Sequence, residues 1–378
     1  MDFSLTEEQQ DVRDLARQIL SEGVSHERLL ALSKSGEWFD MDLWKTVAGA
    51  GLPAVALPEG CGGSGFGPIE LALVLEEMGR HVAPIPLLAT SVLAAAPIAR
   101  FGSDAQRERW LAPLTSEAAV LSAALVESGS SDPARPRTTA RRDGDGWLLS
   151  GEKICVPAGH LARLVLVPAR SDDGVGVFGV DPSADGVTVE TQVSTSGEPQ
   201  ARLLLEGVRV GADDVLGDVA GGADVVQWTV HLATLALAAV QVGVAAGALA
   251  DTAKYVAERK QFGRPIATFQ GVALRAADAW IDVECLRATV LQAAWRLANG
   301  RPAEAEIAAA KWWAATAGMR VVHTAQHLHA GIGSDMEYPV HRYFLWAKQN
   351  ELLFGGANQQ LANIGALLVA DERAGAGA

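Results

Sequence analysis

The sequence predicts an α+β fold, in which a helical segment is followed by a strand-rich segment and then by a second helical segment. From Thr6 to about Ser116 the apolar side chains recur at helical spacing. From about Ala118 to Val215 short apolar runs alternate with Gly, Asp, Ser and Pro, which is typical of short strands joined by turns. After Gly221 long helical stretches return. We therefore expect helices, then a small β-barrel or sandwich, then a helical bundle.

These changes of pattern divide the chain into three expected domains. We place an N-terminal α-helical domain at residues 1–117, a middle β-barrel domain at 118–220 and a C-terminal four-helix-bundle domain at 221–372. The chain has 378 residues, of which 49% are hydrophobic, so it is long enough to bury a core in each of two or three lobes.

The N-terminal segment has a clear helix start and few strand signals. Thr6 precedes the first apolar period, and its hydroxyl can accept a hydrogen bond from the N–H groups left free at a helix start. The glycine-rich stretch 60–67 is predicted to be a turn, because it lacks the Lys-Ser/Thr ending of a loop that binds a triphosphate.

The middle segment contains the expected strands, and the last segment contains long helices. The strands are predicted at Leu148–Leu149, Leu164–Val167, Val175–Val180, Val187–Val193 and Leu203–Val210. The helices are predicted to break at Gly263–Pro265, Asn299–Pro302, Ala330–Asp335 and Gly355–Gly356. The apolar stretch 232–249 is interrupted by Gln241 and two glycines, so we interpret it as a packed helix rather than a membrane span.

Charge and cysteine content disfavour several classes of function. Thirty-one Lys and Arg against forty-five Asp and Glu give a net charge of −14, which disfavours nucleic acid or an anionic membrane as the main partner. The cysteines Cys61, Cys155 and Cys285 lack the spacing of a metal site or a disulfide framework, which predicts a reducing, cytoplasmic compartment. Four histidines between residues 323 and 341 lack paired carboxylates, so their spacing favours helix capping and polar packing over metal binding.

The stretch Arg259–Gly263, reading Arg-Lys-Gln-Phe-Gly, ends the Ala-rich helix and carries the strongest chemical signal. A guanidinium offers two parallel donors that match two oxygens of a pyrophosphate, and a nearby Phe ring can cover an adenine. Five residues alone also fit a basic helix end, which the helix macrodipole favours. The rest of the chain decides between these two interpretations.

Further segments follow the order of one known family. They are Met1–Gln10, Ala56–Gly67 (Ala-Leu-Pro-Glu-Gly-Cys-Gly-Gly-Ser-Gly-Phe-Gly), Asp145–Lys153, His329–Gly333 and Glu337–Phe344. Together with the Arg-x-x-Phe-Gly segment they resemble the acyl-CoA dehydrogenases over nearly all of the chain. The resemblance implies that family's fold, FAD as cofactor, an acyl-CoA thioester as substrate and an electron-transfer flavoprotein as electron acceptor.

This sequence departs from that family where the catalytic base is expected. In the family a carboxylate removes a proton from the carbon next to the thioester carbonyl while the β-hydride passes to the flavin. The usual position of this carboxylate corresponds here to Gly355, within Phe354–Ala357, and a second position corresponds to Ala233 and Thr234. None of these side chains carries a carboxylate, so we predict that the chain has no catalytic residue.

The segments that hold the flavin ring in the family are altered as well. The loop Val126–Asp132, which corresponds to the family's TExxAGSD, is one residue short and lacks the first hydroxyl. In the strand corresponding to KxWIT, Cys155 replaces an aromatic ring, and Pro157 replaces a hydroxyl and a backbone donor. The chain alone is therefore predicted not to form a complete active site.

The segments that reach a neighbouring subunit's cofactor in the family are retained. The resemblance implies that Arg259, Phe262, Gln270 and Gly331 bind FAD shared at a subunit interface. The chain further resembles the non-catalytic partner subunit of actinobacterial heteromeric acyl-CoA dehydrogenases that act on CoA thioesters of steroid side chains. We therefore expect a homologous catalytic subunit as partner, in an α2β2 assembly.

Two other functions stay open on the sequence. A self-sufficient flavoenzyme would need a relocated base, for which Glu351, one helical turn before Gly355, is the candidate. A relative without redox chemistry would keep only a binding or scaffolding role.

Overall fold

The computed structural model of the chain describes residues 3–130 and 132–376. By its internal contacts the chain divides into two compact units. The first consists of Met1–Gly36, Pro68–Ala83 and Thr234–Ala378, and the second of Glu37–Gly67 and Pro84–Ala233. The long helix α8 (Gly222–Glu258) contributes residues to both.

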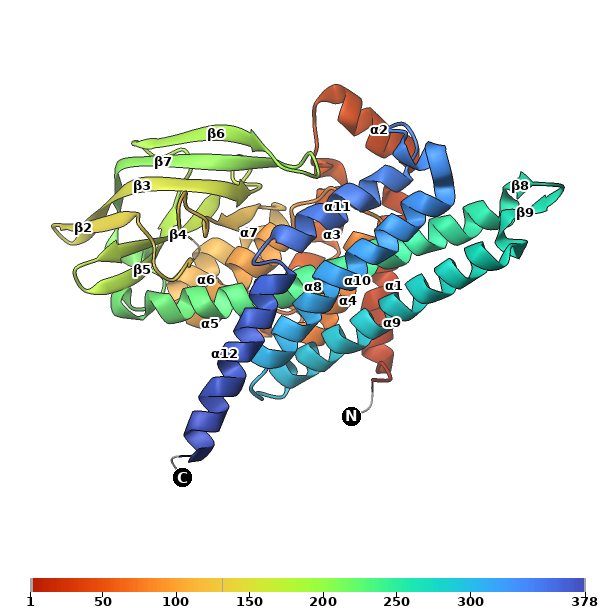
Figure 1. Cartoon of the computed structure of the whole chain (residues 1–378). Coiled ribbons are helices and arrows are strands. Elements are labelled where there is room, and N and C mark those ends of the chain that lie inside the picture. The colour runs from red at the N-terminus through yellow and green to blue at the C-terminus, as the bar shows by residue number, and fades with distance from the viewer. Residues whose placement is uncertain (1–2, 131, 377–378) are drawn as a thin grey trace. The chain divides into compact units, whose positions relative to one another are not determined.

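The first unit is built from helices (Figure 1). They are α1 (Glu7–Gly23), α2 (His26–Ser35), α4 (Pro68–Arg80), the C-terminal part of α8, α9 (Gln270–Ala298), α10 (Glu304–His329), α11 (Val340–Leu352) and α12 (Ala357–Ala376). Shorter elements between them are β8 (Lys260–Gln261), β9 (Arg264–Pro265) and the 3-10 turns η6 (Ile266–Thr268) and η7 (Ala330–Ser334). The chain breaks between α8, α9, α10, α11 and α12 are those predicted from glycine and proline.

The first helix begins at the residue expected from the sequence. Thr6 Oγ1 accepts a hydrogen bond from Gln9 N at 3.2 Å, and Gln9 Oε1 accepts one from Thr6 N at 3.1 Å. This reciprocal pair satisfies N–H groups that a helix start leaves free. Gln9 Nε2 also donates to Glu70 Oε1 at 2.8 Å, which ties α1 to α4.

Helix α8 is strongly apolar, and its apolar side chains lie in the core. Its most apolar 18-residue window has a mean hydropathy of 2.0, and 94% of that window is buried, in agreement with the prediction of a packed helix. Helix α4 crosses α8 at glycines: a Cβ at Gly79 would lie 2.0 Å from Val240 O, and a Cβ at Gly243 would lie 1.8 Å from Glu76 O. No other residue fits at either position without moving a backbone.

The second unit contains the sheet. Its strands are β1 (Leu121–Ala123), β2 (Thr139–Asp143), β3 (Gly146–Pro157), β4 (Leu164–Ser171), β5 (Gly174–Val180), β6 (Val187–Val193) and β7 (Pro199–Val210). They pair in the order β1-β4-β2-β3-β7-β6, and β5 pairs with β4. β1 and β2 run parallel to β4, and the remaining pairs are antiparallel. Each predicted apolar run lies within one of these strands, which confirms the strand-rich middle segment.

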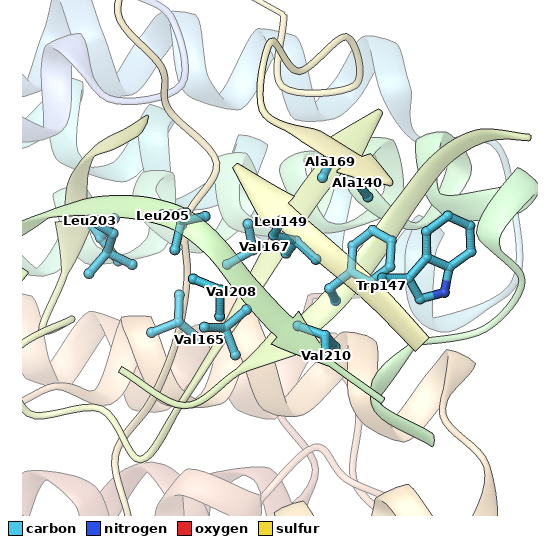
Figure 2. Close-up of a cluster of buried hydrophobic side chains, with 14 of the residues drawn as sticks. Ala140, Trp147, Leu149, Val165, Val167, Ala169, Leu203, Leu205, Val208 and Val210 are labelled. Carbon is cyan, nitrogen blue, oxygen red and sulfur yellow. The ribbon is translucent and has the colours of Figure 1, made fainter. Parts of the chain in front are cut away.

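Apolar side chains from several strands of the sheet form one buried cluster (Figure 2). Trp147 on β3 contacts Phe178 on β5, with ring centroids 5.6 Å apart, and Leu149, Leu203 and Val167 pack into the same buried cluster. Alternating residues of a strand point to opposite faces, which is why Trp147 and Leu149 of β3 and Leu203 and Leu205 of β7 share this core.

Short helices complete the second unit. They are α3 (Met41–Gly49), η1 (Leu52–Ala54), η2 (Glu59–Cys61), the π-helix η3 (Leu88–Ala95), α5 (Ala96–Phe101), α6 (Asp104–Leu111), α7 (Pro113–Ser116), η4 (Ala212–Asp214) and η5 (Val219–Gly221). The sequence did not predict a π-helix. Its buried Thr90 is tied to β1, because Thr90 Oγ1 accepts from Leu121 N at 3.2 Å and donates to Leu121 O at 3.3 Å.

Candidate cofactor-binding site

The predicted pyrophosphate-binding stretch forms a hairpin between the C-terminal end of helix α8 and the start of helix α9 (Figure 1). Strands β8 and β9 are antiparallel, and Gln261 pairs with Arg264. The two residues of the turn are left-handed, with φ of 52° at Phe262 and 79° at Gly263. Two successive left-handed residues are the pattern of the tight turns that suit two-residue hairpins.

The hairpin exposes an aromatic ring. Phe262 is 92% exposed, and its ring contacts Phe269 edge-on at a centroid distance of 6.2 Å. The Arg264 guanidinium lies 4.2 Å from the centre of the Phe269 ring. Burying a Phe side chain contributes about 1.5–3 kcal/mol, so a molecule that covered this ring would gain that stabilisation.

Positive charge gathers at this hairpin although the whole chain is acidic. Residues 259–275 contain four basic side chains and no acidic one. The basic ones are all exposed: Arg259, Lys260, Arg264 and Arg275. Helix α9 begins at Gln270 without a side-chain cap, so its first N–H groups and its positive dipole end are available to an anion. This arrangement suits a phosphate-containing ligand.

Gly331 lies apart from the hairpin, in the turn η7 after α10. The turn folds back closely on the helix end: a Cβ at Gly333 would lie 2.7 Å from Gln326 Oε1. Ala330, where the family segment has glycine, has φ 55° and ψ −138°, a conformation that alanine rarely adopts. The structure therefore gathers Arg259, Phe262 and Gln270 at one hairpin and holds Gly331 in a separate exposed turn.

Gly355, which corresponds by sequence resemblance to the usual position of the family's carboxylate, lies at the corner between α11 and α12. Gly355 has φ 92°, a left-handed backbone that favours glycine. A Cβ there would lie 3.0 Å from Gln359 Cγ and 3.1 Å from Gln360 Nε2. Gln360, which is 3% exposed, donates from Nε2 to Phe354 O at 2.9 Å and to Gly355 O at 3.2 Å. The corner is fixed in a conformation that disfavours any side chain at Gly355.

Glu351, the candidate for a relocated base, is held at the end of α11. Its Oε2 accepts a hydrogen bond from Lys348 Nζ at 2.7 Å. Its backbone carbonyl and that of Asn350 accept from Lys311 Nζ at 3.0 and 2.7 Å. Lys311 is fully buried, and this burial lowers its pKa to about 8. Glu351 thus has local structural partners at a helix end.

In the second unit the two segments expected to hold the flavin ring lie side by side. Val126 bridges to Ile154 on β3. Next to this bridge Lys153 Nζ lies 2.6 Å from Glu127 Oε1, and the two residues are 1% and 6% exposed. Burial alone would raise the pKa of Glu127, but hydrogen bonds from Lys153 and Thr138 hold it below its usual range. The paired carboxylate fastens the loop to the barrel.

The positions that departed from the family's flavin bed offer no ring and no hydroxyl. Cys155 has φ 52°, its N–H donates to Gln192 Oε1 at 2.9 Å, and burial raises the pKa of its thiol. The Pro157 carbonyl accepts from Ser122 Oγ at 2.5 Å. The residues of this chain therefore fit the ADP portion of FAD at the hairpin better than they fit the flavin ring at the barrel.

Sequence reasoning missed the groups that fix these segments. The roles of Lys311, Gln360 and the Glu127–Lys153 pair depend on partners from other elements, and a lysine gives no local signal of burial. The Gln-Gln pair after two glycines could have indicated a side chain capping the corner. Within the described residues, no group of three or more His, Cys, Asp or Glu is placed to hold a metal ion.

Comparison with known proteins identifies the relatives of this fold and site. Models of the acyl-CoA dehydrogenase N-terminal, middle and C-terminal domains match residues 6–118, 124–208 and 220–368. The chain is 40% identical over 373 residues to "Acyl-CoA dehydrogenase FadE27" of Mycobacterium tuberculosis, and the match covers 97% of this chain and 98% of the relative.

Two solved structures are similar over nearly their whole length. One is a variant of the Tcur3481-Tcur3483 steroid ACAD, with 44% identity, a TM-score of 0.89, and coverage of 97% of this chain and 99% of that one. The other is the ChsE4-ChsE5 complex from Mycobacterium tuberculosis, with 41% identity, a TM-score of 0.91, and coverage of 98% and 99%.

Proposed function

This chain belongs to the acyl-CoA dehydrogenase family of flavin-dependent oxidoreductases, and we propose that it is the base-free subunit of a two-component enzyme of that family. A homologous partner supplies the catalytic carboxylate and the bed of the flavin ring. This chain completes the partner's FAD site from across the interface. The α2β2 assembly introduces an α,β double bond into an acyl-CoA thioester.

The corner at Gly355 is the observation that carries this proposal. Its left-handed backbone and its close contacts with Gln359 and Gln360 disfavour a carboxylate at this position. General-base catalysis contributes about 10²–10⁴-fold to a rate, so an enzyme of this chemistry needs a base from elsewhere. A second chain of the same family is the simplest source.

The retained part of the site supports a shared cofactor. FAD, when bound, accepts the hydride that leaves the β-carbon of the substrate. Arg259 would pair with its pyrophosphate, Phe262 would cover its adenine, and the N–H groups at Gln270 and Gly331 would add donors. The exposure of these groups on this chain supports the proposal of a cofactor bound mainly by another subunit.

The substrate and the electron acceptor extend the proposal. The 44% identical structure is described as a steroid ACAD with two named chains, and the 41% identical one is a complex of two named chains. These likenesses support a CoA ester of a steroid side chain as substrate and a two-component assembly. An electron-transfer flavoprotein as acceptor and a cytoplasmic location complete the proposal.

Arg259→Ala tests the proposed contact of the Arg259 guanidinium with the pyrophosphate, which we call the clamp. In the assembly recovered through an affinity tag on this chain, we expect FAD to bind at least about tenfold more weakly, because charged hydrogen bonds contribute about 1.5–3 kcal/mol each. Arg259→Lys should restore only part of the affinity, since an ammonium lacks the planar fork. FAD absorbance per assembly and an FAD titration measure both effects.

The matched control is Lys254→Ala, which removes an exposed cation from the same helix. It should leave FAD affinity unchanged, because Lys254 precedes the clamp by more than one helical turn. Full FAD retention in an intact Arg259→Ala assembly would show that the hairpin does not bind the cofactor.

A further inference from the structure

Three rings from separate elements meet beside the Gly331 turn. Tyr255, in the last turn of α8, stacks on His329, the last residue of α10, with centroids 4.4 Å apart and planes at 22°. Tyr338, which precedes α11, contacts both rings, at 5.4 Å from His329 and 6.3 Å from Tyr255. His329 is 1% exposed, so its ring is enclosed in this cluster.

Two of the rings continue directly into the segments proposed to bind FAD. The Arg259 N–H donates to the Tyr255 carbonyl at 2.8 Å, so the arginine leaves α8 from the turn that carries Tyr255. His329 is followed by Ala330, with its strained positive φ, and then by Gly331. The stacked pair therefore connects the hairpin to the turn through side chains.

The His329 ring is held in one tautomer and one orientation. Its Nδ1 lies 2.8 Å from Ala325 O, and because a carbonyl only accepts, Nδ1 carries the hydrogen. Burial lowers the pKa of His329, although the Ala325 carbonyl and the Asp251 carboxylate act in the opposite direction. The ring is thus neutral at physiological pH, and it packs as a flat aromatic group between the tyrosines.

We propose that His329 is a positioning residue, which fixes the Gly331 turn relative to Arg259 so that both segments reach the same pyrophosphate. This inference rests on the proposed function. A flat ring packed between two others permits little displacement, whereas a smaller side chain leaves a cavity. Without the ring, the strained turn at Ala330 can relax away from the hairpin.

Three variants separate the ring from its hydrogen bond. His329→Ala removes both and should weaken FAD binding to the tagged assembly about tenfold. His329→Phe keeps the stacked ring and should stay within about threefold of wild type. His329→Asn keeps an N–H donor at the position of Nδ1 for Ala325 but has no ring, so its FAD affinity should resemble that of His329→Ala.

The measurements are the FAD dissociation constant and thermal unfolding of the same samples. If the His329 variants that lack the ring lower the unfolding temperature while the FAD dissociation constant stays at its wild-type value, His329 is merely structural and the proposal is wrong. Equal affinity of His329→Phe and His329→Asn overturns it as well. The comparison of these two variants tests the proposal even where His329→Ala does not fold.

A double variant links the inference to the clamp. If His329 acts by aligning the turn with Arg259, then His329→Ala should weaken FAD binding less in an Arg259→Ala background than in wild type, because coupled residues are not additive. Additive losses contradict the inference. An Arg259→Ala variant with wild-type FAD affinity sinks the proposed function itself, whereas weak binding there with normal binding in His329→Ala sinks only the positioning role.

Discussion

Lys311 shows how a single side chain can hold the end of a helix. Its ammonium donates to the carbonyls of Asn350 and Glu351, which lie in the last turn of α11. Carbonyls at a helix C-terminus carry partial negative charge and favour a cation there. Burial acts in the opposite direction and lowers the pKa of Lys311 from 10.5 to about 8. The stability of this corner should therefore depend on pH.

The sign of this dependence follows from the two pKa values. Between pH 8 and the unfolded pKa, the unfolded chain holds a proton that folded Lys311 has released, so the free energy of unfolding rises with pH. From pH 8 to about pH 9.5 the gain should be on the order of 1.5 kcal/mol. Below pH 8 both states are charged, and the folded state bears the cost of burial. Urea unfolding at several pH values measures the gain.

Lys311→Met should remove this rise, because methionine does not titrate. The comparison is the difference between wild type and variant at each pH, since the cysteines and tyrosines that also titrate are the same in both. Lys254→Met, a change at an exposed lysine, should keep the wild-type slope. A slope in Lys311→Met equal to that of wild type would contradict this account of the buried ammonium.

At the scale of elements, the corner between α11 and α12 gives a second prediction. Gly355→Glu restores a carboxylate at the family's position, but it should lower the free energy of unfolding by about 1–3 kcal/mol, because a left-handed backbone is strained for any other residue. Its Cβ would also lie 3.0 Å from Gln359 Cγ and 3.1 Å from Gln360 Nε2, which is closer than ordinary van der Waals contact. No dehydrogenase activity of this chain should appear, since Cys155 and Pro157 still lack a ring platform.

Gly356→Glu is the matched control for this substitution. A Cβ at Gly356 meets its nearest atom, Glu351 O, at 3.6 Å, and its backbone is not among the left-handed positions. The same carboxylate one residue later should therefore destabilise less. Equal losses in chemical unfolding for the two variants would show that the backbone of Gly355 is not what excludes a side chain.

The same elements show which features a sequence can predict. Thr6, the breaks around Gly263 and Pro302, and the apolar runs of the sheet were predictable because caps, turns and alternation are local signals. The left-handed backbone of Gly355 was not, because glycine is compatible with most conformations. The contact of Tyr255 with His329 joins residues far apart in the chain, and the π-helix at Leu88–Ala95 leaves no periodicity of its own.

For the candidate site, the sequence predicted which residues are present but not how the fold arranges and exposes them. The resemblance placed Arg259 and Phe262 in one segment, and the structure adds that both are exposed at the tip of a hairpin. Exposure is a property of the folded surface, and it is this property that suggests a cofactor held by another chain. The contacts that fix Gly331 and Gly355 come from α8, α10 and α12, so no local pattern could reveal them.

For the whole molecule, the remaining question is what covers its exposed apolar side chains. In addition to Phe262 in the hairpin, three apolar side chains of helix α9 are between 53% and 59% exposed: Leu274, Trp280 and Ile281. Leu274 and Ile281 are seven residues apart and therefore lie on one face of the helix. This face adjoins the hairpin, so a partner that brings FAD to the hairpin could bury both. A chain prepared without that partner should lack FAD and be prone to self-association.

The last prediction compares the chain produced alone with the assembly recovered from cells through a tag on the chain. Alone, it should carry far less than one FAD per chain after gel filtration, because Cys155 and Pro157 offer nothing to hold the ring. The tagged assembly should contain a homologous second chain, FAD and acyl-CoA dehydrogenase activity. Arg259→Ala in this assembly should release FAD without releasing the second chain, since in the proposed assembly Arg259 contacts the cofactor rather than the apolar face of α9. If the chain alone is instead fully yellow and active, it is a self-sufficient enzyme, and Glu351 becomes the first residue to test as its base.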